Sequence, residues 1–198
     1  MIDSIVWAFR HTERNVADVG LHLLLEMLQR FADAGTFCTQ FHRVYYRSLV
    51  HEVFAVLTDS FHKPGFKLHV KILHHLFSLV QEPGRITAPL WEGDEELAAA
   101  VSAGTAAAPG NNTEYVRRYV GNLLSRSFPN MQPVQVAACV EGMFTLRDYT
   151  AFKQHLRDFL VQTKEFADSD NTELFVEEVK KAQQEAMNQG GMPGLVPQ

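Results

Sequence analysis

Apolar residues recur at helical spacing along most of the chain, and the clearest case runs from Thr150 to Phe166. Five residues of this segment stand at i, i+4, i+7, i+8 and i+11, namely Phe152, Leu156, Phe159, Leu160 and Thr163. The spacing predicts an α-helix with one apolar face and with charged or amide side chains opposite. Because a helix cannot bury its own apolar face, we expect helical neighbours on both sides in sequence.

The amino-terminal part of the chain predicts a first helical hairpin. A short apolar helix from Ile2 to His11 precedes a helix that begins near a plausible N-cap, Asn15, and ends at Gly35. The first helix lies so close to the start of the chain that we expect a preceding part of the protein. The predicted apolar face of the second helix comprises Val16, Val19, Gly20, Leu23, Leu24, Met27, Leu28 and Phe31.

Two further hairpins follow the same plan. A long helix begins at Thr36 and ends in the Lys-Pro-Gly turn at 63–65, and its partner covers Leu68 to Gln81. In the other hairpin, Asn112 or Thr113 would cap the first helix, and Pro133 suits the first turn of the second.

The stretch 85–111 differs in composition from the rest of the chain. It is rich in glycine and alanine, so it is predicted to be a surface insertion with one weak helix from Glu95 to Val101. The acidic cluster from Glu92 to Glu96 is then most simply a solvated loop.

A last helix is predicted near the carboxyl end. Asp170 and Glu173 resemble a capping box, and the helix stops at Gly190. Its stripe fades from large residues to alanine along Phe175, Val179, Ala182 and Ala186. This weakening is typical of a terminal helix that lies across a surface.

These predictions together describe an all-α fold. Hairpins recur about every 35 to 45 residues, near the period of HEAT-type repeats, and such hairpins stack into an α-solenoid. We therefore expect the C-terminal end of a longer superhelix, with a self-contained helical bundle as the competing fold. The predicted divisions are HEAT-type hairpins at 1–84, the insertion at 85–111, a hairpin and a last A-type helix at 112–167, a C-terminal helix at 168–189 and a flexible tail at 190–198.

Charge and cysteine usage narrow the class of partner. The formal net charge of −5 at pH 7 argues against a broad nucleic-acid or acidic-membrane surface, so proteins are the expected partners. The start lacks the features of a signal peptide, and no apolar run approaches the length of about 20 residues that spans a bilayer. Cys38 and Cys139 are expected to be reduced, buried thiols.

Candidate catalytic and metal-binding groups do not form a recognisable site. His69, His74 and His75 fall on different helical faces, unlike the i, i+4 pair of a zinc helix. Cys38 and His42 share a face, but no orienting third group or oxyanion site accompanies them, so a structural cysteine is favoured. Glycine-rich phosphate-binding motifs are absent from the sequence as well. We expect no catalytic residue, no cofactor and no metal, and therefore no enzyme.

Several blocks of the sequence are too long and ordered to reflect composition alone. The most extensive is AFKQHLRDFLVQTKEFA at Ala151–Ala167. The others are DSIVWAFRHTERNVADVGL at Asp3–Leu21, FAVLTDSFH at Phe54–His62, EYVRRYVGNLLSRSFP at Glu114–Pro129, ELFVEEVKKAQ at Glu173–Gln183 and MPGL at Met192–Leu195. These blocks resemble the carboxy-terminal end of the exportin-1 family of nuclear export signal receptors, within the importin-β (karyopherin) class.

The resemblance implies the last four or so HEAT repeats of a ring-shaped receptor. Such a receptor carries leucine-rich export-signal cargo with Ran-GTP through the nuclear pore and shuttles between nucleus and cytoplasm. The implied partners are the Ran GTPase in its GTP form, Phe-Gly nucleoporins, and cargo bound through the rest of the receptor. No nucleic acid or membrane partner is implied, and neither Cys38 nor Cys139 takes the role of the reactive cysteine in the middle of the family's chain.

The resemblance also implies a regulatory role for the helix at 168–189. In the family this helix crosses the inside of the ring and disfavours cargo binding until Ran displaces it. The residues that we assign to this regulatory contact are Leu174, Phe175, Val179 and Ala182. The tail at 190–198 departs from the family because it lacks an acidic end.

Two alternatives stay open at this point. A stand-alone helical-repeat adaptor that binds a peptide helix would be a cooperative monomer, whereas a solenoid end should expose apolar surface at Ile5, Trp7 and Phe9. A cysteine- or metal-dependent enzyme would hold stoichiometric zinc or an abnormally reactive Cys38.

Overall fold

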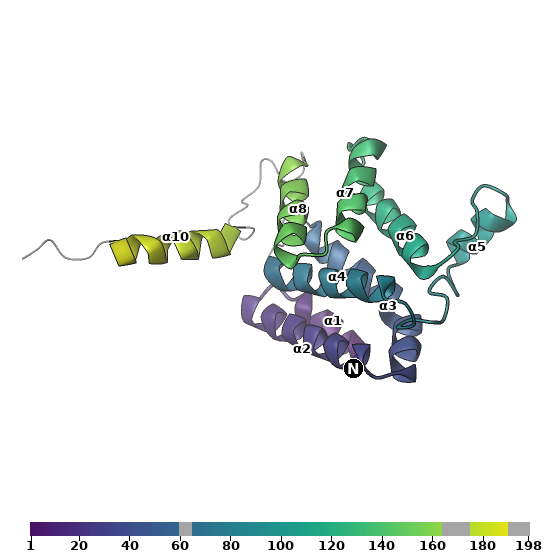
Figure 1. Ribbon diagram of the computed structural model, residues 1–198, viewed down its shortest axis with the longest axis horizontal. Helices are drawn as coiled ribbons and strands as arrows, with labels where there is room; N and C mark the ends of the chain where they lie inside the picture. The colour runs from purple at the N-terminus through teal and green to yellow at the C-terminus, as the bar shows by residue number, and fades with distance from the viewer. Residues whose placement is uncertain (60–64, 164–174, 190–198) are drawn as a thin grey trace, which may run out of the picture.

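A computed structural model describes residues 1–59, 65–163 and 175–189, and Figure 1 shows its arrangement. These residues form α-helices and connecting loops, without strands in the described ranges. The helices are α1 (Ile2–Phe9), α2 (Arg14–Ala32), α3 (Thr36–Leu57), α4 (Phe66–Gln81), α5 (Glu95–Ser102), α6 (Asn112–Ser127), α7 (Pro133–Thr145), α8 (Tyr149–Gln162) and α10 (Val176–Gln189). The predicted all-α fold class is confirmed.

The three predicted hairpins are present as packed pairs. Helix α1 packs on α2, α3 on α4, and α6 on α7, while α8 packs on both α7 and α4. In Figure 1 the pair α1–α2 lies on one side of α4, and α7 and α8 lie on the other. The helical-repeat architecture follows from this order, because each pair presents an apolar face that only its neighbours cover.

Helix α4 is the centre of the body formed by α1–α8. It contacts α2, α3, α6, α7 and α8, and most of its side chains are buried. Phe77 joins the layers, because its ring lies 4.8 Å from that of Phe144 on α7, 6.2 Å from that of Phe152 on α8 and 6.4 Å from that of Phe54 on α3. The Tyr46 hydroxyl on α3 also donates a hydrogen bond of 2.9 Å to the carbonyl oxygen of Leu76 on α4.

The apolar face predicted for α2 is partly wrong. Gly20, Leu24 and Leu28 are buried as expected, but Val19 is 59% exposed and Leu23 is 50% exposed. The reason is the close approach of α1, which needs small residues on α2. A Cβ atom at Gly20 would lie 2.7 Å from the backbone nitrogen of Phe9. The buried face is therefore rotated toward Ala17, Gly20 and Leu21.

Two smaller predictions at the amino-terminal end are wrong as well. Phe9 was expected to be exposed at the end of a solenoid, yet it is fully buried, whereas Trp7 is 64% exposed and Ile5 is half-buried. The N-cap of α2 is Glu13, two residues before the predicted Asn15.

The stretch 85–111 is held to the body more firmly than a solvated insertion would be. Leu90 is buried, and the side chain of Asn112 bridges the segment. Its amide nitrogen donates to the carbonyls of Ile86 at 3.1 Å and Ala88 at 3.0 Å, and its oxygen accepts from the Leu90 backbone N–H at 2.8 Å. One polar residue at the start of α6 therefore orders the chain that precedes it.

Each helix in the described part of the chain is too short or too polar to cross a bilayer.

Candidate functional site

Helix α8 is positioned by the apolar stripe that its sequence predicts. Phe152, Leu156, Phe159, Leu160 and Thr163 are all buried, which confirms the predicted face. Asp148 caps the helix by accepting a hydrogen bond of 2.8 Å from the Ala151 N–H. At Gly142 on α7 the missing side chain leaves room for His155, whose Nε2 lies 2.8 Å from the carbonyl oxygen of Cys139. Packing thus fixes the direction of the polar face of α8.

That polar face carries the contacts between the body and α10. The Arg157 guanidinium lies 4.7 Å from the centre of the Phe175 ring, and its Nη1 lies 2.5 Å from a carboxylate oxygen of Glu178. Lys153 lies 3.9 Å from the same oxygen. The side chains of Lys153 and Arg157 are only 13% and 14% exposed. Two partly buried cations on α8 therefore face the first turn of α10.

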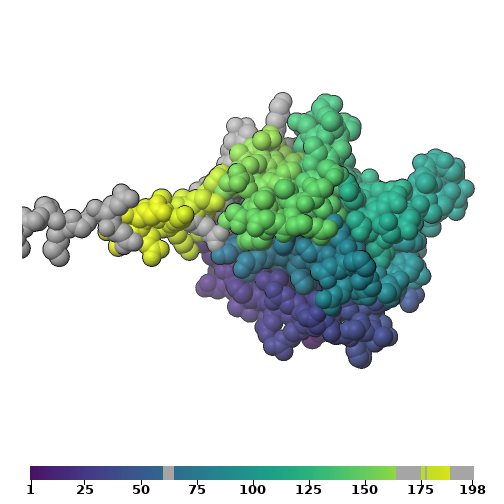
Figure 2. Space-filling view, in the orientation of Figure 1, coloured from purple at the N-terminus to yellow at the C-terminus, as the bar shows by residue number. Residues whose placement is uncertain are grey.

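Helix α10 otherwise extends away from the body (Figure 2). Among the residues assigned to the regulatory contact, Phe175 is half-buried and packs against the body. Val179 is 44% exposed and Ala182 is exposed, whereas Leu174 lies outside the described residues. The regulatory role of these residues stays a prediction.

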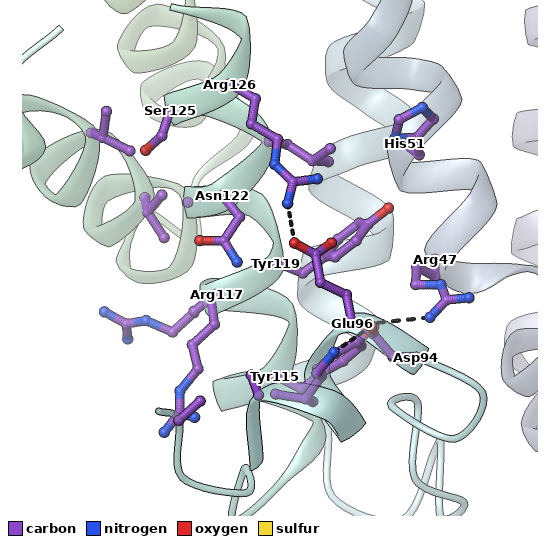
Figure 3. A pocket seen from close by; sticks show the side chains of 18 of the residues that line it. Arg47, His51, Asp94, Glu96, Tyr115, Arg117, Tyr119, Asn122, Ser125 and Arg126 are labelled. Atoms are coloured by element: carbon purple, nitrogen blue, oxygen red, sulfur yellow. Dashed lines mark hydrogen bonds and ion pairs between the residues drawn. The ribbon is translucent and has the colours of Figure 1, made fainter. Parts of the chain in front are cut away.

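A second candidate site is a cleft of about 1270 Å³ beside α6 (Figure 3). Its walls come from α3, the start of α5, both sides of α6, and α7. Four arginines and four acidic residues contribute to the lining, namely Arg47, Arg117, Arg118, Arg126, Asp94, Glu95, Glu96 and Glu141. The arginines pair with nearby acids, including Arg126 with Glu96, Arg117 with Glu141 and Arg118 with Glu114. Because these charges balance, the cleft has no excess of either sign to select a charged ligand.

Asp94 corrects the prediction of a solvated acidic loop. One of its carboxylate oxygens accepts a hydrogen bond of 2.7 Å from the Tyr115 hydroxyl and lies 3.5 Å from Arg47, and the other accepts from the Leu97 N–H at 3.1 Å. Burial acts to raise the pKa of Asp94, but these hydrogen bonds and the Arg47 charge outweigh it and lower the pKa below 3.8. Asp94 is therefore a structural anchor that caps α5 and ties it to α3 and α6.

The two cysteines have the environment predicted for structural thiols. Cys38 and Cys139 are unpaired and buried, and burial raises the pKa of both. The Cys38 sulfur lies 3.6 Å from Nδ1 of His42, which is also 2.8 Å from the Cys38 carbonyl oxygen. A thiol with a raised pKa is a poor nucleophile at neutral pH, so this pair does not form an activated cysteine. Within the described ranges, no cluster of three or more histidine, cysteine or acidic residues could hold a metal ion.

His42 makes the fold sensitive to mild acid. Its side chain is fully buried, and burial lowers its pKa from 6.5 to about 4. Between pH 6.5 and pH 4, His42 is therefore protonated in the unfolded chain but neutral in the folded chain. The contribution of His42 to the free energy of unfolding is fully present above pH 6.5 and is lost as the pH falls toward 4. Between pH 7 and pH 5 this histidine should remove about 2 kcal/mol of unfolding free energy.

Urea unfolding at both pH values measures this loss. His42→Gln should reduce the difference between pH 7 and pH 5 by most of that amount. His51→Gln, a matched change at an exposed position on the same helix, should leave the difference unchanged. An equal pH dependence in all three proteins would contradict the assignment.

The amino-acid sequence is similar to that of known proteins over nearly its whole length. Residues 1–168 match the family described as "CRM1 C terminal". The chain is 48% identical over 199 residues to the protein EXPORTIN 1A of Arabidopsis thaliana, covering 99% of this chain and 17% of the relative. It is 40% identical over 206 residues to Exportin-1 of Schizosaccharomyces pombe and 35% identical over 202 residues to Exportin-1 of Drosophila melanogaster. Each comparison covers 99% of this chain, which spans 18% and 17% of those two relatives.

Proposed function

Because the chain belongs to the CRM1 C-terminal family of exportin-1 proteins, we propose that it forms the carboxy-terminal part of a nuclear export receptor. The observation that carries this proposal is the extent of the similarity, which covers 99% of the chain. Since the chain spans only 17% of its Arabidopsis relative, the activity of the whole receptor depends on further sequence.

In this proposal the chain works by binding and not by catalysis. The body α1–α8 is a scaffold at one end of a superhelical receptor, which carries export-signal cargo together with Ran-GTP. Phe-Gly nucleoporins are the proposed contacts during passage through the pore, and the receptor shuttles between nucleus and cytoplasm. The buried thiols and the charge-balanced cleft support a binding role, because neither offers an activated nucleophile or a charged-substrate site.

Helix α10 is the proposed autoinhibitory element of the receptor. A regulatory helix must detach, so its contacts should contribute only a few kcal/mol of difference between two states. The exposed, alanine-rich face of α10 fits this requirement, because it leaves few large apolar groups to bury. Leu174, Phe175 and Val179 are the large apolar residues that we expect to bias the equilibrium.

Polar substitutions in α10 test this role in the complete receptor. Changing Leu174, Phe175 and Val179 to serine should raise the affinity for an export-signal peptide without Ran about tenfold, because a bias of 1.4 kcal/mol corresponds to that factor. Fluorescence anisotropy of a labelled peptide measures the change. Met187→Ser, on the same helix but 81% exposed, is the control and should have no effect. If the triple variant binds the peptide as the parent does, α10 is not autoinhibitory.

A further inference from the structure

The start of α10 and Phe175, the residue directly before it, make the described contacts between this segment and the body. Phe175 packs against the body, and Glu178 lies beside Lys153 and Arg157. From Glu178 to Met187 every side chain is exposed. In the described part of the chain, α10 therefore contacts the body only near its amino-terminal end.

The support is built around the guanidinium of Arg157. Its central carbon lies over the ring of Phe175, 4.7 Å from the ring centre, and its Nη1 lies 2.5 Å from a carboxylate oxygen of Glu178. Phe175 directly precedes α10 and Glu178 lies in its first turn, and the single cation of Arg157 engages both. Arginine suits this position because its plane stacks on an aromatic ring while its edge donates to a carboxylate, which lysine cannot do.

The Arg157 side chain is largely buried where it meets Phe175 and Glu178. The side chain is 14% exposed, and its buried Nε has no hydrogen-bond partner. The neighbouring carboxylate of Asp158 lies 3.7 Å from that Nε, beyond hydrogen-bond distance. Lys153, 13% exposed and 3.9 Å from Glu178, adds a second cation on the same side. The carboxylate of Glu178 is therefore drawn toward α8 from two positions.

We propose that Arg157, Phe175 and Glu178 form a pivot that sets the direction in which α10 leaves the body. This inference rests on the proposed regulatory function of α10 for its consequence in the receptor. The pivot holds the first turn while the remainder of the helix points outward, and its direction decides which surface the exposed stripe at Val179 and Ala182 meets. Arg157 is a positioning residue, because it acts through the orientation of α10 and not by contact with a ligand.

Spin-label distance measurements on the 198-residue chain test the pivot directly. Labels on Thr150→Cys in α8 and Gln184→Cys in α10 occupy exposed positions, while native Cys38 and Cys139 are 1% and 3% exposed and should not react. The parent should give one narrow distance distribution. Arg157→Ala should at least double its width, and Arg157→Lys should broaden it to an intermediate degree, because charge remains without the stacking plane.

Two controls separate the pivot from general damage to the helix. Lys181→Ala removes a positive charge that pairs with Glu185 on the exposed surface of α10. This change should leave the distance distribution narrow. Far-UV circular dichroism should be the same for all variants, because the buried face of α8 is untouched. A distribution in Arg157→Ala as narrow as in the parent would overturn the pivot.

Cargo affinity distinguishes failure of the pivot from failure of the proposed function. Arg157→Ala in the complete receptor should raise export-signal affinity without Ran if α10 is both pivoted and autoinhibitory. A broadened distribution with unchanged affinity supports the pivot and removes the regulatory role. A narrow distribution removes the pivot whatever the affinity does.

Discussion

Replacing Phe77 with alanine is expected to lower the free energy of unfolding by about 4 kcal/mol, a large share of the stability of an ordinary domain. The side chain is 1% exposed at the centre of α4. It is the one ring that meets aromatic residues of α3, α7 and α8 together in the described part of the chain, at Phe54, Phe144 and Phe152. Truncation leaves a cavity where three layers join, and it removes aromatic pairs worth about 0.5 to 1.5 kcal/mol each.

Chemical unfolding followed by circular dichroism measures this loss. Phe37→Ala is the matched control, because Phe37 is 63% exposed on α3 and its truncation should change stability by less than about 0.5 kcal/mol. Equal stabilities of the two variants would show that α4 is not the centre of the fold.

Replacing Gly20 with alanine is expected to lower the free energy of unfolding by about 3 kcal/mol, against the usual preference for alanine in helices. The new Cβ would lie 2.7 Å from the backbone nitrogen of Phe9 and 2.9 Å from the Cβ of Ala8. Because backbone cannot move aside as a flexible side chain can, α1 must shift away from α2. Phe9, which is fully buried, would then lose part of its packing.

The same substitution at Gly121 provides a control of opposite sign. Gly121 lies inside α6, where a Cβ would meet Val140 at an ordinary 3.9 Å. Gly121→Ala should therefore stabilise the protein by up to about 1 kcal/mol through helix propensity. Thermal unfolding of both variants gives the comparison, and a stabilising effect at Gly20 would contradict the close contact between α1 and α2.

The helices could be predicted from the sequence because apolar spacing is a local signal. The predicted caps were wrong by one or two residues, because Glu13 and not Asn15 precedes α2, and Asn111 and not Asn112 or Thr113 caps α6. The stripe of α8 was predicted residue by residue, but α3 ends at Leu57, well before the predicted turn at 63–65, of which 63 and 64 lie outside the described residues.

The face of α2 was not predictable in the same way. Val19 and Leu23 are more hydrophobic than Ala17 and Gly20, yet the small residues are buried because they allow α1 to approach. The hydrophobicity of individual residues does not reveal that α1 needs small side chains on α2.

The polar contacts were also beyond prediction, because they join residues far apart in sequence. Asp94 belongs to an acidic cluster that resembles a solvated loop, and only the fold brings Tyr115 and Arg47 to it. Likewise, Phe175 was assigned to the predicted C-terminal helix at 168–189 for its apolar stripe, but its partner Arg157 lies on the polar face of α8. The periodic signal that identifies Phe175 carries no information about a cation packed over its ring.

If this chain works as one end of a longer nuclear export receptor, the native protein must be much larger than the chain. The most direct measurement is the mass of the native protein, detected by immunoblot with an antibody raised against residues 150–188. We expect a single band several times larger than 22.4 kDa, because the chain spans only 17% of its Arabidopsis relative. A band at 22.4 kDa would contradict it, because a protein of that size would lack the rest of the receptor.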